Sequence, residues 1–315
     1  MCVVVPGLNE GDNLSFLCQE LTRVLGGSSW TLEIIFVDDG SSDKTIQVCR
    51  QLHGTNSNFQ YISLSRNFGH QRALTAGLDA ASGDAVVVID ADLQDPPEVV
   101  LEMIHLWEEG VDVVYGQRQS REGETFFKKA TAKLFYRCLR LLSGTSIPED
   151  TGDFRLMDIR VVEELRKLRE QGRFLRGLVS WLGFEQRPVF YTRRPRVGGT
   201  TKYSFLRMLH FGWDGITAFS SIPLRLATLT GVALSFLAFL MTIYYIFCKI
   251  YYNDFVRGWA SLMVAILAVG GVQLLFIGLV GEYLAKAFEE LKERPLYIVR
   301  ESSLPLVRDA PSPPK

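Results

Sequence analysis

An unbroken run of β-branched side chains near the middle of the chain sets the strongest constraint on its fold. Residues 86–89 read Val-Val-Val-Ile and lie in the segment 85–98, AVVVIDADLQDPPE. Such a run suits a parallel strand buried on both faces better than a strand with one wet face. The run stops at Asp90, and the Pro-Pro pair at 96–97 fits the first turn of a helix. We therefore expect an α/β fold with helices covering a mostly parallel, doubly wound sheet.

Two carboxylates and an amide follow this strand, namely Asp90, Asp92 and Gln94. Ligands of open α/β sheets bind at the carboxyl ends of the strands. Oxygen ligands of this kind suit Mg²⁺ or Mn²⁺, and such an ion would neutralise a diphosphate. An Asp-x-Asp pair also arises by chance, and Asp95 could simply cap the next helix. The motif alone leaves both interpretations open.

Length and composition narrow the class of protein. The chain has 315 residues, which is room for one sizeable domain and a second element, and 47% of its residues are hydrophobic. Its net charge of -1 gives no case for nucleic-acid binding. The cysteines and histidines show no metal-ligand spacing, so we expect reduced, packed thiols and no histidine-based metal site. A strand is expected from Cys2, which predicts no signal segment ahead of it.

A strand–loop–helix pattern occurs three times before the central strand, with strands expected at 2–5, 32–37 and 61–64. This alternation predicts right-handed crossovers and polar loops gathered along one sheet edge. The loops lack the glycine fingerprints of dinucleotide and phosphate-loop sites. They carry carboxylates instead, so Asp39 could accept from a base and Glu10 from ribose hydroxyls. Ordinary turn and cap roles are the alternative.

Five short motifs occur in an order and spacing that resemble a known family. They are Val-Pro-Gly-Leu-Asn-Glu at 5–10, Val-Asp-Asp-Gly-Ser at 37–41, Asn-Phe-Gly at 67–69, Asp-Ala-Asp-Leu-Gln-Asp-Pro-Pro at 90–97 and Thr-Gly-Asp-Phe-Arg at 151–155. The chain resembles the family 2 inverting glycosyltransferases over nearly its whole length. More closely, it is similar to the polyprenyl-phosphate glycosyltransferases of the dolichyl-phosphate mannose synthase-like branch.

The resemblance implies a GT-A-type fold and a set of site residues. It implies nucleotide binding by Pro6, Glu10, Asp39, Arg66, Asp90 and Ala91, metal binding by Asp90, Asp92 and Gln94, and phosphate binding by Arg118 and Lys128. It also implies that Asp153 is the catalytic base, with Arg155 near phosphate. A lipid phosphate has a second pKa of about 6 and is mostly ionised at neutral pH. We therefore hypothesise that Asp153 chiefly orients the acceptor or the sugar hydroxyls.

Two segments carry basic residues without a settled role. The predicted helix 121–142 is basic and amphipathic, so it could lie on an anionic membrane surface or be an ordinary helix with a solvated face. Residues 191–213 hold five basic side chains and no acidic one, which favours anionic headgroups or a lipid phosphate. Within them, Lys202 in a glycine-rich loop could close over the donor diphosphate. Residues 203–221 fit an interfacial helix, with a soluble-core helix as the rival.

Residues 226–248 and 259–281 contain no charged side chain, and each stretch is 23 residues long. At about 1.5 Å per residue, either could cross a hydrocarbon core of about 30 Å. The short connection predicts a hairpin, and the basic flanks predict an integral membrane protein with its sheet domain in the cytoplasm. Glycines in the second stretch permit packing in the hairpin or between subunits, so we expect a homo-oligomer.

These observations predict four parts: a glycosyltransferase domain at 1–195, a basic loop and interfacial helix at 196–222, a transmembrane pair at 223–285 and a tail at 286–315, disordered from about Ser302. The expected reaction is inverting transfer of a hexose to undecaprenyl or dolichyl phosphate. UDP-glucose is the favoured donor by resemblance to bacterial glucosyl members, with GDP-mannose and UDP-aminosugars open. A processive synthase would need a Gln-x-x-Arg-Trp motif and more spans. A non-catalytic adaptor would be expected to have lost some of the acidic motif residues.

Overall fold

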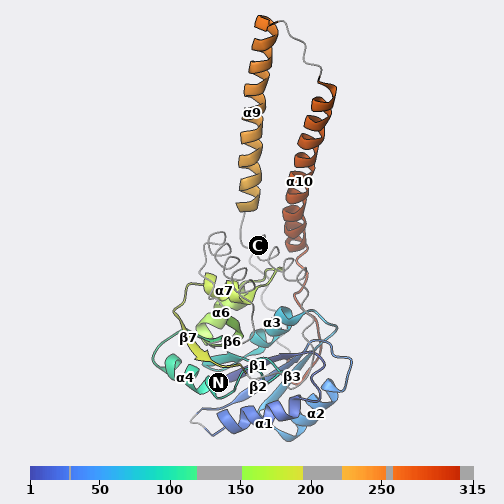
Figure 1. Ribbon diagram of the computed structural model, residues 1–315. Coiled ribbons are helices and arrows are strands. Elements are labelled where there is room, and N and C mark those ends of the chain that lie inside the picture. The colour runs from blue at the N-terminus through green and yellow to red at the C-terminus, as the bar shows by residue number, and fades with distance from the viewer. Residues whose placement is uncertain (28–29, 119–150, 194–221, 253–257, 306–315) are drawn as a thin grey trace. The chain divides into compact units, whose positions relative to one another are not determined.

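The computed structural model describes residues 1–27, 30–118, 151–193, 222–252 and 258–305 (Figure 1). These residues belong to two compact units. The sheet unit holds the described residues up to 193 together with 294–305, and the helical unit holds 222–252 and 258–293. The sheet unit is therefore built from segments on both sides of the helical unit in the sequence.

The first part of the sheet unit alternates strands with helices, as the sequence predicts. The strands are β1 (Cys2–Gly7), β2 (Glu33–Asp38), β3 (Phe59–Leu64) and β4 (Ala85–Val88). The helices are α1 (Leu14–Leu25), α2 (Thr45–Thr55), α3 (His70–Ala80) and α4 (Val99–Glu108). All pairings among these four strands are parallel, so their carboxyl ends share one edge. The expected α/β fold is confirmed.

The rest of the sheet breaks the parallel pattern. Its strands are β5 (Val113–Arg118), β6 (Thr151–Asp158), β7 (Gln186–Tyr191) and β8 (Val299–Ser302). The helices α6 (Ile159–Lys167) and α7 (Leu175–Trp181) lie between β6 and β7 in the sequence. Among the described residues the strand order is β7-β5-β6-β4-β1-β2-β3-β8. β6 lies between β4 and β5 and runs antiparallel to both. It therefore brings its amino-terminal end to the carboxyl edge of the parallel strands.

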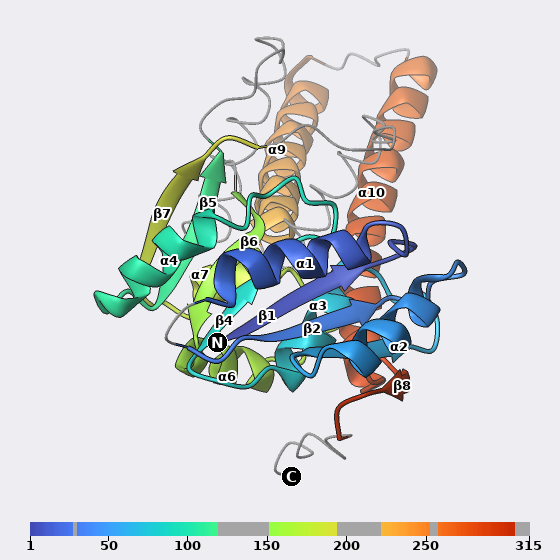
Figure 2. The ribbon, with the colours of Figure 1, turned by 90° about the horizontal axis from the view of Figure 1, so that it is seen from below.

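Helices pack on both faces of the sheet (Figure 2). On one face, Leu17 of α1 and Met103 of α4 join a core with alternate strand residues such as Phe36. On the other face α3 approaches β1 closely, because a Cβ placed on Gly77 would lie 2.3 Å from Val4 Cγ1. Both faces are thus covered, which explains why the central strand carries apolar residues in succession.

The helical unit contains α9 (Ile222–Tyr252, 31 residues) and α10 (Trp259–Leu291, 33 residues), which contact each other (Figure 1). Among its described residues, one stretch is long and apolar enough to cross a membrane, Val269–Leu291. A shorter apolar stretch runs over Ala227–Met241 in α9. The expected second span stays a prediction.

The segment after α10 differs from the expected tail. α10 continues to Leu291, and residues 299–302 form β8, which pairs antiparallel with the edge strand β3. Glu301 accepts hydrogen bonds from the Arg50 guanidinium at 2.8 and 2.5 Å and from the Tyr61 hydroxyl at 2.7 Å. The backbone of β3 gains hydrogen-bond partners, so this segment forms an edge strand of the sheet instead of the expected tail. Residues 306–315 lie outside the described residues.

Candidate active site

The register of β4 and β6 brings two carboxylates to neighbouring positions. Val88 of β4 lies opposite Arg155 of β6, and the strands are antiparallel. Asp90 follows Val88 by two residues, and Asp153 precedes Arg155 by two. Residues two apart on a strand point to the same face, so the two acids meet at the carboxyl edge. Like charges at opposed positions destabilise a sheet, so this pair requires positive charge nearby.

His70 supplies part of this positive charge. It is the first residue of α3, and its Nε2 lies 3.2 Å from Asp153 Oδ2 and 3.7 Å from Asp90 Oδ1. Burial disfavours the protonated ring, but the hydrogen bond with Asp153 and the charge of Asp90 outweigh burial and raise the pKa of His70. The imidazole therefore bridges the two acids and favours its cationic form.

Asp153 accepts further hydrogen bonds from two helices. Gln71 Nε2 donates to Oδ2 at 3.0 Å, and Arg176 of α7 donates Nε to Oδ1 at 2.9 Å and Nη2 to Oδ2 at 3.3 Å. Burial of the carboxyl opposes ionisation, but the hydrogen bond with His70 and the charge of Arg176 hold the pKa of Asp153 well below its usual range. Asp153 is therefore an ionised carboxylate fixed by several donors.

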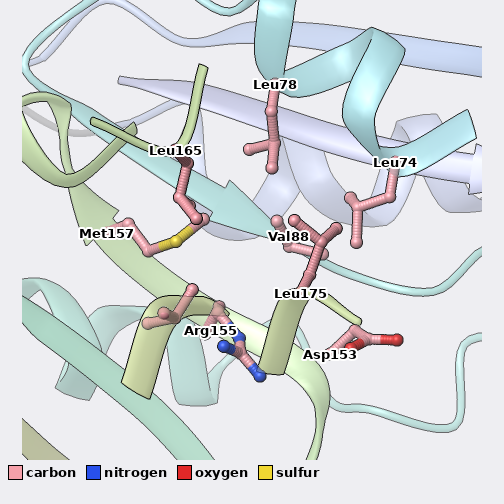
Figure 3. Close-up of a pocket in the computed structure, with 9 residues that line it drawn as sticks. Leu74, Leu78, Val88, Asp153, Arg155, Met157, Leu165 and Leu175 are labelled. Atoms are coloured by element: carbon pink, nitrogen blue, oxygen red, sulfur yellow. The ribbon is translucent and has the colours of Figure 1, made fainter. Parts of the chain in front are cut away.

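Arg155 lies on the same face of β6 as Asp153. Its side chain is buried, and Nη2 donates to the Gly152 carbonyl at 3.1 Å. Burial lowers the pKa of Arg155 to about 10, and the neighbouring Asp153 opposes this shift. The guanidinium is thus charged at neutral pH. Figure 3 shows Asp153 and Arg155 as the charged members of a small pocket whose other walls are apolar. Those walls are Leu74, Leu78, Val88, Met157, Leu165, Leu175 and Val179.

Asp90 faces a concentration of negative charge. Its Oδ1 is buried without a hydrogen-bond partner among the described residues, although the side chain as a whole is 30% exposed. Burial raises the pKa of Asp90 to about 6; the charge of His70 opposes this rise, and the carboxylates of Asp153, Asp95 and Asp92 add to it. A carboxylate oxygen that has no hydrogen-bond partner and lies among other carboxylates, with the His70 ring 3.7 Å away, fits a divalent cation.

The loop after β4 is held by its own turn and by β7. Asp92 Oδ1 accepts a hydrogen bond from the Gln94 backbone N–H at 3.2 Å. Leu93 between them has a φ of 55°, a conformation that a leucine keeps only where the surrounding turn holds it. Tyr191 donates its hydroxyl to Asp95 Oδ1 at 2.5 Å, and Arg193 Nε lies 3.4 Å from the same oxygen. Among the described residues, no three His, Cys, Asp or Glu side chains form a metal-binding group. The metal ligands expected from the sequence are two carboxylates and the amide of Gln94, so they do not form a group of three such side chains.

The residues expected to bind the nucleotide follow the neighbouring strands. Pro6 is buried in β1 opposite Val37, and Ala91 is buried beside Asp90. Asp39 follows β2 and accepts from the backbone N–H groups of Phe68 at 2.7 Å and Gly69 at 3.0 Å. Burial raises the pKa of Asp39, and these two hydrogen bonds oppose the rise. Asp39 therefore also shapes the loop after β3.

Glu10 and Arg66 lie on the loops beside these strands. Glu10 Oε2 accepts from Asn13 Nδ2 at 2.9 Å, and its carbonyl accepts from the first residues of α1. The Arg66 guanidinium lies 4.1 Å from the centre of the Phe68 ring, a cation–π distance. Asn9 joins the loops after β1 and β2, since it bonds both Ser41 and Ser42. The carboxyl edge is thus a connected set of loops.

The three residues expected to hold phosphates have different outcomes. Arg118 is the last residue of β5, and its Nη2 lies 3.3 Å from where a Cβ on Gly152 would stand. Arg118 therefore lies beside Gly152, the residue that precedes Asp153 in β6. Lys128 and Lys202 lie outside the described residues, as do the helix expected at 121–142 and the interfacial helix expected at 203–221.

The sequence did not single out His70, Gln71 or Arg176, and the histidines were considered only as possible metal ligands. The signal for the first two is their position, directly after the loop that follows a buried parallel strand. Arg176 offers a weaker signal, because its helix has seven residues and follows β6 at a distance. The structure thus joins the acid of one motif to polar residues that no motif contains.

A mostly parallel sheet with an acidic loop at its carboxyl edge is the arrangement of a GT-A-type glycosyltransferase. Residues 2–166 match the model of glycosyl transferase family 2, and residues 222–287 match the GtrB C-terminal hairpin. The chain belongs to glycosyl transferase family 2 and is a transferase.

Several curated proteins are similar over almost the whole chain. An uncharacterized glycosyltransferase, YkcC of Bacillus subtilis, is 47% identical over 300 residues, covering 95% of this chain and 93% of that protein. The bactoprenol glucosyl transferase of Shigella phage SfII is 39% identical over 300 residues, covering 95% and 97%. Among solved structures, glucosyl-3-phosphoglycerate synthase from Mycobacterium tuberculosis with Mn²⁺ and UDP-glucose aligns with a TM-score of 0.45 at 19% identity, covering 69% of this chain and 76% of that one.

Proposed function

We propose that this chain transfers a hexose from a nucleotide sugar to a polyprenyl phosphate at a membrane surface, with inversion at the anomeric carbon. Glucose from UDP-glucose is the favoured donor. The observation that carries the proposal is the meeting of Asp90, whose Oδ1 has no hydrogen-bond partner among the described residues, and the ionised Asp153 at one sheet edge. Relatives named bactoprenol glucosyl transferase, similar from end to end, support the acceptor class.

The acidic loop is the proposed place for a divalent cation. Asp90, Asp92 and Gln94 would hold Mg²⁺ or Mn²⁺, and the bound ion would stabilise the charge of the leaving nucleoside diphosphate. Asp90 and Asp92 are partly exposed and Gln94 is buried, and Asp92 Oδ2 lies 3.8 Å from Arg193 Nη2. Tyr191 and Arg193 also contact Asp95 and so hold the turn in place.

The remaining strand ends are proposed to bind the nucleoside. Asp39 and Glu10 would accept hydrogen bonds from base and ribose, with Pro6 and Ala91 forming the apolar floor. Arg66 would lie beside the base, held by the Phe68 ring. These assignments rest on the position of each residue at the carboxyl edge, where α/β sheets bind their ligands.

We propose that Asp153 orients the reacting groups and does not abstract a proton. A good general base has a pKa near the working pH, but donors and nearby arginines depress the pKa of Asp153 strongly. The acceptor phosphate is already ionised at neutral pH, so the nucleophile needs little deprotonation. Fixing the geometry of the attack is then the larger contribution that Asp153 can make.

We propose that the helical unit anchors the chain in the membrane that holds the lipid acceptor. α9 and α10 would form the two spans of a transmembrane hairpin, and the flanking basic residues would place the sheet unit on the cytoplasmic side of a bacterial plasma membrane. Lys128, Lys202 and Arg118 would contact phosphates there, and copies of the chain would associate through the spans. The apolar stretch Val269–Leu291 and the match to the GtrB C-terminal hairpin support this arrangement.

The test uses the purified full-length chain in detergent with undecaprenyl phosphate, Mg²⁺ or Mn²⁺, and radiolabelled UDP-glucose, GDP-mannose or UDP-N-acetylglucosamine in parallel. We expect a glycolipid product from UDP-glucose that EDTA abolishes. Asp92→Asn should remove most of this turnover, while Asp84→Asn, an exposed aspartate at the opposite end of β4, should not. Product from another donor alone would replace glucose in the proposal. No product from any donor would contradict it.

A further inference from the structure

The strand β7 ends at the same sheet edge as the acidic loop at residues 90–95. β7 runs parallel to β5 (Figure 2), and both β5 and β4 run antiparallel to β6, so the carboxyl ends of β7 and β4 lie at one edge. Tyr191 is the last residue of β7, and its hydroxyl donates to Asp95 in this loop. Arg193 follows Tyr191 by two residues and reaches the same loop.

The Arg193 guanidinium lies near two carboxylates of the acidic loop. Its Nη2 is 3.8 Å from Asp92 Oδ2, and its Nε is 3.4 Å from Asp95 Oδ1. The side chains of Arg193 and Asp92 are each 27% exposed, whereas that of Asp95 is 1% exposed. Solvent therefore screens these charges only in part. A positive charge thus lies beside Asp92, one of the two carboxylates proposed to hold the cation.

These ion pairs act through charge rather than through directed hydrogen bonds. Arg193 Nε is buried and has no hydrogen-bond partner among the described residues, although Asp95 Oδ1 is close. That oxygen instead accepts from the Tyr191 hydroxyl at 2.5 Å. An interaction of this kind depends on charge and distance more than on the planar fork of a guanidinium. We therefore expect a lysine at this position to act as Arg193 does.

A positive charge beside the metal ligands has opposite effects on the two parts of a metal–nucleotide complex. Arg193 and a divalent cation at the acidic loop carry like charges, so they repel each other. The diphosphate of a nucleotide sugar is negative, so Arg193 attracts it. The diphosphate carries at least as much negative charge as the ion carries positive charge, and their complex therefore has no net positive charge. Arg193 then opposes the free ion and does not oppose the complex.

We propose that Arg193 makes the acidic loop bind the complex of a divalent cation with the donor's diphosphate in preference to the free cation. The proposal deepens the proposed function and rests on it for the place of the cation at Asp90, Asp92 and Gln94. Arg193 is not one of these ligands, and its effect needs no unpaired hydrogen-bond donor, because its charge acts through space. The ligand class is a divalent cation coordinated to a nucleoside diphosphate.

The test measures binding without turnover. Free Mn²⁺ is titrated into the purified full-length chain in detergent at neutral pH and followed by electron paramagnetic resonance, and UDP is titrated calorimetrically at saturating Mn²⁺. Arg193→Gln should bind free Mn²⁺ roughly threefold to tenfold more tightly, because a nearby like charge is removed. The same variant should bind UDP at saturating Mn²⁺ more weakly, since an attraction to the diphosphate is lost. A disturbed loop would instead weaken the binding of both.

Two further variants separate the charge of Arg193 from its packing. Arg193→Met keeps the apolar stem without the charge, so it should show the same two shifts and replaces Arg193→Gln if that variant does not fold. Arg193→Lys keeps the charge and should bind free Mn²⁺ as the unchanged chain does.

The matched control is Arg187→Gln, which removes another arginine from the same segment. Arg187 is 50% exposed and its Nη2 lies 2.9 Å from Glu185 Oε1. It lies in β7, six residues before Arg193, which is roughly 20 Å along an extended segment. This separation exceeds the screening length of about 10 Å at moderate salt. Arg187→Gln should therefore leave the binding of Mn²⁺ and of UDP unchanged.

The outcomes separate this inference from the proposed function. Tighter Mn²⁺ binding together with weaker UDP binding in Arg193→Gln supports the inference, even if the unchanged chain makes no glycolipid from any donor and so contradicts the function. Glycolipid synthesis by a chain in which Arg193→Gln produces only one of these shifts, or neither, overturns the inference and leaves the function standing. Mn²⁺ binding in Arg193→Lys that is as tight as in Arg193→Gln also overturns the inference.

Discussion

Replacing Asp90 by asparagine should make the metal-free protein more stable while removing its activity. The ionised carboxyl of Asp90 is disfavoured by burial, and the nearby acids Asp153, Asp95 and Asp92 disfavour it further despite the charge of His70. Asparagine keeps the shape of the side chain and carries no charge. The native state then no longer bears the cost of ionising this group, and a ligand of the proposed cation is lost.

The magnitude follows from the pKa. Asp90 titrates at about 6 in the folded chain against a usual value of 3.8. Each pKa unit corresponds to about 1.4 kcal/mol, so the full difference is roughly 3 kcal/mol at neutral pH. Solvent screens a side chain that is 30% exposed, which reduces the expected gain to ~1–2 kcal/mol. For a domain of this size that gain is a rise of roughly 3–6 °C in Tm.

The gain should depend on pH with a definite sign. The pKa of Asp90 is higher in the folded state than in the unfolded state, so the folded chain gains a proton first as the pH falls. The advantage of Asp90→Asn is therefore complete above the folded pKa of about 6 and shrinks as the pH falls toward 3.8. Below that pH the carboxyl is neutral in both states, and the difference disappears.

The assay is thermal unfolding of the purified chain in detergent with EDTA, at several pH values from 4 to 8, which bracket the pKa of about 6. Asp84→Asn, at the exposed aspartate directly before β4, is the control for loss of an aspartate. Asp153→Asn should move Tm the opposite way, because it breaks a buried ion pair with Arg176, a loss on the order of 3 kcal/mol. If Asp90→Asn lowered Tm in EDTA at pH 7.5, or if its gain were the same at pH 4, the reasoning would be refuted.

Three further predictions concern binding and packing. Mn²⁺ binding, measured by electron paramagnetic resonance, should weaken about tenfold per pH unit below the Asp90 pKa of about 6, and a flat profile would contradict the assigned ligand. Gly77→Ala should destabilise the chain by ~1–3 kcal/mol in chemical denaturation because its Cβ would meet Val4, whereas Gly54→Ala, with open space around it, should stabilise it by up to ~1 kcal/mol. Ser303→Ala should lower the free energy of unfolding by ~1 kcal/mol, because it removes the acceptor of the Tyr61 backbone N–H. Amide hydrogen exchange in β3 should then become faster, and unchanged exchange would contradict the stabilisation of β3 by the segment that contains β8.

The local part of the fold could be predicted because local patterns determine it. Each parallel strand is a short apolar run, and each is followed by polar loop residues and an amphipathic helix, so β1 to β4 follow from the sequence in order. The acidic loop was expected for the same reason, since Asp90 and Asp92 come directly after a buried strand. Boundaries were less accurate, as in β1, which was expected at 2–5 and continues to Gly7.

The long-range part could not be predicted from such patterns. The position of β6 between β4 and β5 depends on pairing with residues far away in the chain, and the alternation of Asp153, Arg155 and Met157 on one face specifies a strand but not its neighbours. The neutralisation of Asp153 by Arg176 and His70 has the same origin. These contacts arise when α3 and α7 pack on the same sheet face, which a single sequence does not encode locally.

The strand β8 has a practical consequence for anyone who wishes to study the sheet unit in water. A fragment that simply stops before α9 would leave the backbone of β3 open to strands of other molecules, and such edges promote aggregation. It would also lose the ion pair between Arg50 and Glu301. A soluble version is better obtained by removing the two long helices and connecting the chain before α9 to the chain after α10 with a flexible linker. Residues 294–305 then remain to pair with β3 at the edge of the sheet.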